Sequence, residues 1–119
     1  MTGLEHAIQG LRQAADTPRR HHMWRWLVRN RLSSVKESLG SDQNPGGEAW
    51  LAAREFSLLR ERNVLLQDLA GVGPLVLEDP DVERVHADLL RLIDRLERYR
   101  QRANDLVYDS VSLELGGSE

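Results

Sequence analysis

A row of basic residues around a tryptophan is the part of this sequence best suited to binding another molecule. Arg25, Arg29 and Lys36 recur along one side of a predicted helix, with Trp26 beside them in the chain. Guanidinium and ammonium groups bind carboxylates and phosphates, and an exposed tryptophan is a frequent hot spot of protein interfaces. We therefore predict a partner-binding surface made of Arg19, Arg20, Arg25, Trp26, Arg29 and Lys36.

The spacing of two tryptophans decides which of them is available for binding. Trp24 and Trp26 are two residues apart, about 200° around a helix, so they point to nearly opposite sides. Trp24 shares its side with Val28 and is expected in the core, whereas Trp26 falls on the polar side. Two covers for Trp26 stay open: a partner, or the N-terminal segment 4–15.

The charge pattern leaves two classes of partner open. The net charge is −3, but residues 1–39 carry seven basic and three acidic side chains, and residues 40–119 carry nine and sixteen. Such asymmetry favours either an acidic partner or attraction between the two parts within the bundle or across a dimer. A protein partner or self-association is the first expectation. Nucleic acid or a peripheral anionic membrane surface, bound through residues 19–36, is the alternative, although the isoelectric point of about 5.8 is low for a nucleic-acid-binding domain.

The histidines raise the question of a metal site. Glu83 and His86 match the Glu-x-x-His unit of di-iron helical bundles, but such sites need two units and two further glutamates, and only one unit occurs here. The pair His21 and His22 has no further ligand nearby in the sequence. We find no nucleophile–base arrangement, phosphate-binding loop or dinucleotide fingerprint. The expectation is a protein without catalytic residues, metal, cofactor or small-molecule substrate.

A heptad repeat in the last third of the chain predicts the fold class. Apolar residues recur at alternating steps of three and four, which is the seam of a helix packed in coiled-coil fashion. The predicted helix begins at Pro80 with Asp79 as its cap and ends near Tyr108. Its seam consists of Val82, Val85, Leu89, Leu92, Leu96, Tyr99, Ala103 and Leu106.

Three further helices are expected. A short one carries the stripe Leu4, Ile8, Leu11 and Ala15. A second runs over residues 18–39, with Thr17 as cap, Pro18 at its first position and Gly40 as a left-handed stop. A third runs over residues 48–70, ends at Gly71 and is followed by a linker over residues 73–78.

The third helix has two adjacent apolar seams, which predicts contact with two neighbours. The second seam consists of Leu51, Leu58, Leu65, Leu69 and Val72. The first seam includes Phe56, Leu59 and Asn63. A buried Asn63 could fix register and meet the hydroxyl of Tyr99.

These elements predict an all-α fold: an elongated antiparallel three-helix bundle with coiled-coil-like packing, plus a short N-terminal helix. Residues 1–108 form the single domain, and residues 109–119 form an acidic tail, either a flexible terminus or a docking peptide. The last helix is longer than a compact globule of this chain length is wide, so a homodimer could cover its end.

The composition of the chain favours one cellular compartment, the cytoplasm. There is no cysteine, no apolar run long enough for a membrane span and no signal-peptide pattern, so we expect a cytoplasmic protein. Fifteen of the sixteen basic residues are arginine, which we interpret as the codon bias of a GC-rich, bacterial genome.

Overall fold

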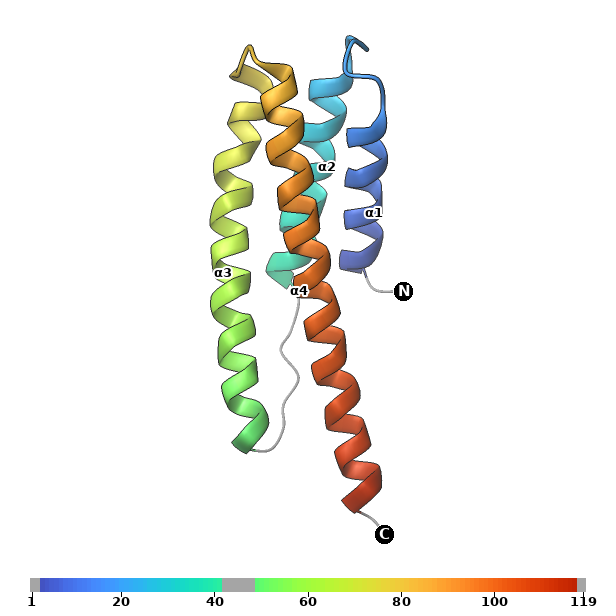
Figure 1. The fold of residues 1–119 in the computed structure, drawn as a ribbon, viewed down its shortest axis with the longest axis vertical. Helices are drawn as coiled ribbons and strands as arrows, with labels where there is room; N and C mark the ends of the chain where they lie inside the picture. Colours follow the sequence, from blue (N-terminus) through green and yellow to red (C-terminus); the bar gives the residue numbers. More distant parts are fainter. Residues whose placement is uncertain (1–2, 42–48, 118–119) are drawn as a thin grey trace.

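The protein is all-helical over the residues that the structure describes, as the heptad pattern predicted. The computed structural model describes the backbone of residues 3–41 and 49–117, with the side chains of residues 3–41 and 56–106. In these ranges the chain forms α1 (Gly3–Asp16), α2 (Trp24–Ser41), α3 (Ala49–Glu78) and α4 (Val82–Gly117) (Figure 1).

The helices form a ring in which each contacts two neighbours. α1 packs on α2, α2 on α3, α3 on α4, and α4 on α1. α1 is therefore a full member of the bundle and not an addition to three helices. The molecule measures 59 × 23 × 20 Å, so it is elongated as expected.

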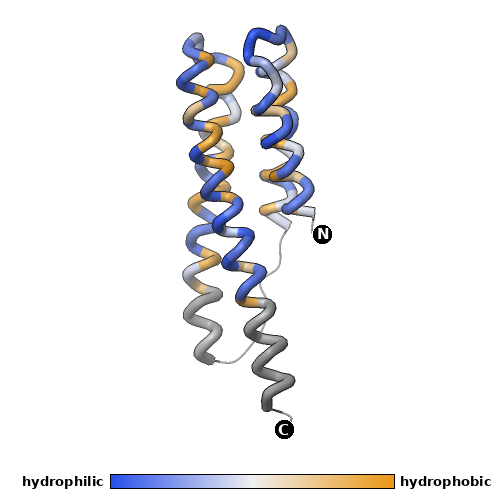
Figure 2. Tube along the Cα trace, turned by 45° about the vertical axis from the view of Figure 1, so that its right-hand side comes forward, coloured by the Kyte–Doolittle hydropathy of each residue, from blue (hydrophilic) through white to orange (hydrophobic). Residues whose placement is uncertain are grey.

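Apolar stripes from all four helices meet in one core. The stripes predicted for α1 and α4 are confirmed, because their members are buried or half-buried along the described length. Hydrophobic and hydrophilic stretches follow one another along the coloured parts of the helices in Figure 2. Burial of apolar side chains in such a core stabilises a fold by roughly 25 cal/mol per Å² of buried apolar area. The core members of α2 are Trp24, Val28, Leu32, Val35 and Leu39.

Only one of the two seams predicted for α3 is in the core. The buried seam contains Leu58, Leu65 and Leu69, whereas in the other Phe56 is 65% exposed and Asn63 is exposed. The prediction of a buried Asn63 is wrong, so this residue has no role in register and does not meet the buried Tyr99. The reason is geometric: neither α2 nor α4 reaches the side of α3 on which Asn63 lies.

α3 continues past its predicted end. The helix runs through Gly71 and Gly73 to Glu78, with Pro74 inside it, so no linker exists over residues 73–78. A proline inside a helix costs about 3 kcal/mol because it removes one hydrogen bond and clashes with the preceding turn. Burial of Val76 and a hydrogen bond to its carbonyl oxygen from Arg25 Nη1, at 2.8 Å, offset that cost.

α2 ends without the predicted left-handed glycine. No glycine in the described residues has a positive φ, and Gly40 lies inside the last turn of α2. Arg62 of α3 instead donates from Nε to the carbonyl oxygen of Leu39, at 3.0 Å, and from Nη2 to that of Gly40, at 2.9 Å. A side chain from a neighbouring helix thus satisfies the free carbonyls that a glycine cap would otherwise serve.

α4 begins later and ends later than predicted. Its cap is Asp81, whose Oδ1 accepts the backbone N–H of Arg84 at 3.1 Å, and not Asp79. Asp79 stabilises the preceding turn by accepting the N–H of Asp81 at 2.9 Å, and Pro80 lies within that turn. At the other end the helix continues to Gly117, so residues 109–117 extend α4 beyond the expected end near Tyr108.

α3 and α4 extend beyond the other two helices at one end of the bundle (Figure 1). The pair Arg62–Leu39 marks the level at which α2 ends, and the ion pair of Arg100 with Glu5 marks the beginning of α1. We call residues 49–61 of α3 and 102–117 of α4 the stalk. Among the described residues, no helix combines the length and apolarity needed to cross a bilayer.

Candidate interaction surface

α2 places its two tryptophans on opposite sides, as their spacing predicted. Trp24 is fully buried; its indole Nε1 lies 3.4 Å from the carbonyl oxygen of Ala15, and its ring is tilted against His86 at a centroid distance of 6.2 Å. Trp26 is 55% exposed. The N-terminal segment, which α1 occupies, therefore does not bury Trp26.

The stripe of Arg25, Arg29 and Lys36 lies on α2, but the rest of the predicted basic surface does not. α2 begins at Trp24, and the chain before it forms a turn in which the N–H of His21 bonds to the carbonyl oxygen of Pro18. Thr17 closes the end of α1, through its hydroxyl bond to the carbonyl oxygen of Gln13, and does not cap α2. Arg19, Arg20 and His22 therefore precede the helix that carries the other basic residues.

Contacts within the bundle engage two of the predicted binding arginines. Arg19 Nε lies 2.7 Å from Glu83 Oε1, and this hydrogen bond holds the pKa of the Glu83 carboxyl below its usual range. Arg25 is bonded to the end of α3, as described above. Arg20 and Lys36, by contrast, make no hydrogen bond or ion pair with any residue that the structure describes, and both are exposed.

The side chain of Arg29 packs closely against α3 at Gly73. Its guanidinium donates to the hydroxyl of Ser33 one turn later, and it makes no ion pair with a described carboxylate. A Cβ on Gly73 would stand 3.3 Å from Arg29 Nε, so the glycine leaves room for the arginine. Arg29 thus lies along the boundary between α2 and α3.

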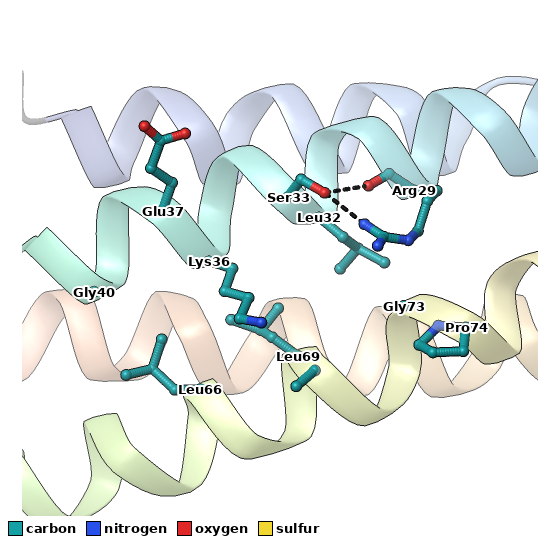
Figure 3. A pocket seen from close by; sticks show the side chains of 11 residues that line it. Arg29, Leu32, Ser33, Lys36, Glu37, Gly40, Leu66, Leu69, Gly73 and Pro74 are labelled. Atoms are coloured by element: carbon teal, nitrogen blue, oxygen red, sulfur yellow. Dashed lines mark hydrogen bonds between the residues drawn. The ribbon is translucent and has the colours of Figure 1, made fainter.

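A groove runs along this boundary. It has a volume of about 490 Å³, and Figure 3 shows Arg29 and Lys36 on its α2 side above the apolar side chains of Leu66 and Leu69. Glu37 also borders the groove but points away from α3 (Figure 3). The groove therefore combines an apolar floor with two cations that have no carboxylate partner in the described residues, and Trp26 lies one helical turn before Arg29.

The histidines do not assemble a metal site in the described residues. No group of three potential ligands occurs there. His21 and His22 stack on each other at 4.9 Å, and His21 Nδ1 accepts the backbone N–H of Met23 at 3.1 Å. Glu83, the other half of the Glu-x-x-His unit, is bonded to Arg19.

Cross-helix ion pairs link the basic N-terminal part of the chain to carboxylates of α4. Arg12 contacts Glu97 Oε1 at 3.0 Å and Asp94 Oδ1 at 3.5 Å. Together with the pair of Arg19 and Glu83, these contacts show that part of the charge asymmetry acts within the bundle. Arg29 and Lys36 are not part of this pairing.

The α3 side of the groove was not predicted from the sequence. Leu66 continues the first seam expected for α3, Leu69 belongs to the second, and Gly73 was assigned to a linker. The buried face of α3 continues through Leu69 to Val76. This continuation was missed because Pro74 was expected to end the helix, whereas α3 runs through it.

No protein-family model, curated protein or solved structure matches this chain.

Proposed function

We propose that the protein is a non-catalytic, cytoplasmic interaction or adaptor module that binds a protein partner through α2. The observation that carries this proposal is the exposure of Trp26, three residues before Arg29 on α2, together with a groove whose cations, Arg29 and Lys36, lack carboxylate partners in the described residues. Large exposed aromatic residues next to charged groups are enriched at binding hot spots. The bundle acts as a rigid support, with coiled-coil-like packing suggested by the three-and-four recurrence of buried residues along α4.

Substitution of Trp26 by alanine tests the proposal. Because Trp26 contributes little to the core, Trp26→Ala should leave the thermal melting temperature within about 2 °C of the parent protein. In affinity capture from the native lysate, a specific protein recovered with the parent chain should be lost with the variant, since hot-spot truncation costs about 2 kcal/mol or more.

Val64→Ala is the matched control, because Val64 is an exposed apolar residue of α3 away from the groove. It should change neither the melting temperature nor the capture. If Trp26→Ala destabilised the fold as a core substitution does, or captured the same proteins as the parent, α2 would not be the binding surface.

Binding of nucleic acid or an anionic membrane is the second candidate. Arg20, Arg29 and Lys36 are available for phosphates, but Arg19 and Arg25 are engaged within the bundle, which reduces the positive surface. Titration against duplex DNA and against anionic vesicles at two salt concentrations tests it, because phosphate contacts give an affinity that falls steeply with salt.

A further inference from the structure

The bundle has a step in its outline that a second copy could fill. At about 1.5 Å per residue, the 18 residues of α2 span about 27 Å and the 36 residues of α4 about 54 Å. The stalk therefore has no cover from α1 or α2, while the other half of the molecule carries all four helices (Figure 1). Two such molecules, placed antiparallel, can each fit the stalk of one beside the four-helix half of the other.

The part of α4 that follows Arg102 is opposite in charge to the groove. After Arg102, α4 contains no basic residue, and its sequence there carries Asp105, Asp109 and Glu114. Asp105 is exposed, and its only hydrogen bond to a described residue is the one that it accepts from Gln101 Nε2, at 3.2 Å. The groove between α2 and α3 presents two cations that have no carboxylate partner in the described residues.

We propose that the partner of the groove is a second copy of this chain, whose acidic α4 stalk lies along Arg29 and Lys36. The contact is reciprocal: the stalk of each copy lies in the groove of the other, related by a twofold axis perpendicular to the long axis. Such an isologous interface closes on itself and forms a dimer, not a filament. The inference rests on the proposed function and names its partner.

Charge reversal on each side of the interface provides the first test. Sedimentation equilibrium of the parent chain at micromolar concentration should give a mass near twice 13.6 kDa. The groove variant Arg29→Glu/Lys36→Glu and the stalk variant Asp105→Lys/Asp109→Lys should each weaken the dimer by about tenfold or more, because like charges then oppose one another.

An equimolar mixture of the two variants is the decisive experiment. In the mixed dimer the negative groove of one chain meets the positive stalk of the other, and the unchanged groove and stalk form the second contact. The mixture should therefore recover the dimer that neither variant forms alone. A mixture that stayed monomeric while the parent chain dimerised would overturn this arrangement.

Two further variants separate charge from folding. Lys36→Glu alone removes a cation with no described partner, so it should weaken the dimer without lowering the melting temperature measured at a concentration where both chains are monomeric. Arg31→Glu makes the same charge change on the side of α2 that faces Gly10 of α1, and it should leave the dimer intact.

Two results would separate the second-copy interface from partner binding through Trp26. A parent chain that is monomeric at every concentration, but captures another protein through Trp26, overturns the second-copy inference and keeps the proposed function. A second result is a dimer that Trp26→Ala abolishes but charge reversal does not affect. That result would keep α2 as the binding surface and would overturn the proposal that the stalk lies in the groove.

Discussion

At the scale of single residues, polar side chains form hydrogen bonds with the backbone groups that are free at the ends of helices. Arg62 bonds the last carbonyls of α2 from the neighbouring helix. Asp79 and Asp81 organise the turn before α4. In each case one side chain satisfies backbone groups that would otherwise depend on water, so its substitution has a predictable cost.

Arg62→Ala should destabilise the protein by about 1–3 kcal/mol, because two hydrogen bonds from a charged donor are lost. Chemical denaturation measures the change, and amide hydrogen exchange should accelerate in the last turn of α2 and not elsewhere. Arg60→Ala, an exposed arginine on the same helix, is the control and should have little effect. Equal stability of the two variants would mean that Arg62 does not hold the end of α2.

The turn before α4 predicts that the stability of the fold declines in acid. The N–H of Asp81, and then Arg84, hold the pKa of the Asp79 carboxyl below its usual range. Glu83 is lowered in the same direction by Arg19. Since these groups take up protons more readily in the unfolded chain, their stabilisation is present above about pH 4 and is lost as pH falls through the lower folded-state pKa.

Asp79→Asn should therefore lower the melting temperature at neutral pH and flatten its decline below about pH 4. Thermal melts across that range provide the measurement. Asp16→Asn is the control, because Asp16 is exposed and makes no hydrogen bond or ion pair with the described residues. A variant as acid-sensitive as the parent protein would show that Asp79 does not contribute to this decline.

At the scale of the element, α3 shows how packing chooses between faces. Its sequence offers two apolar seams, and the ring of helices buries the one that contains Leu65. The other seam leaves Phe56 exposed and Leu59 half-buried. α4 has a single seam, and there the predicted and observed faces agree.

Leu92→Ala on α4 should cost about 2–5 kcal/mol, the range for a buried leucine. Leu59→Ala on α3 should cost less, below about 2 kcal/mol, because its side chain is only partly covered. Denaturant unfolding of both variants measures the difference. Equal losses would mean that the second seam of α3 also lies in a core.

At the scale of the whole molecule, unequal helix lengths set the shape. α3 and α4 extend past α1 and α2 and lengthen the bundle to 59 Å. The Cα radius of gyration is 16.6 Å, compared with about 13.5 Å for a compact domain of this length. The same feature creates the step that the second copy is proposed to fill.

X-ray scattering of the groove variant Arg29→Glu/Lys36→Glu, once shown to be monomeric, should give a radius of gyration well above the compact value and near 16.6 Å, apart from a small increase from hydration. A value near the compact one would mean that the stalk folds back. The parent chain, if dimeric, should give a larger value.

The sequence by itself determined the helical class and most of the core. The stripes of α1, α2 and α4 have one apolar side each, and one period of 3.6 residues is enough to say which residues are buried. The same argument placed Trp26 on the side opposite Trp24, but only the structure showed that α1 does not cover it.

Tertiary structure alone decided the ends of helices and the choice of face on α3. Gly71 and Pro74 are local stop signals, yet burial of Val76 against α2 outweighs them. Gly40 is a local cap signal, yet Arg62 performs that task from another helix. The groove exists for the same reason: its two sides lie about forty residues apart in the chain, and local propensity carries no information about which distant side chains will face each other.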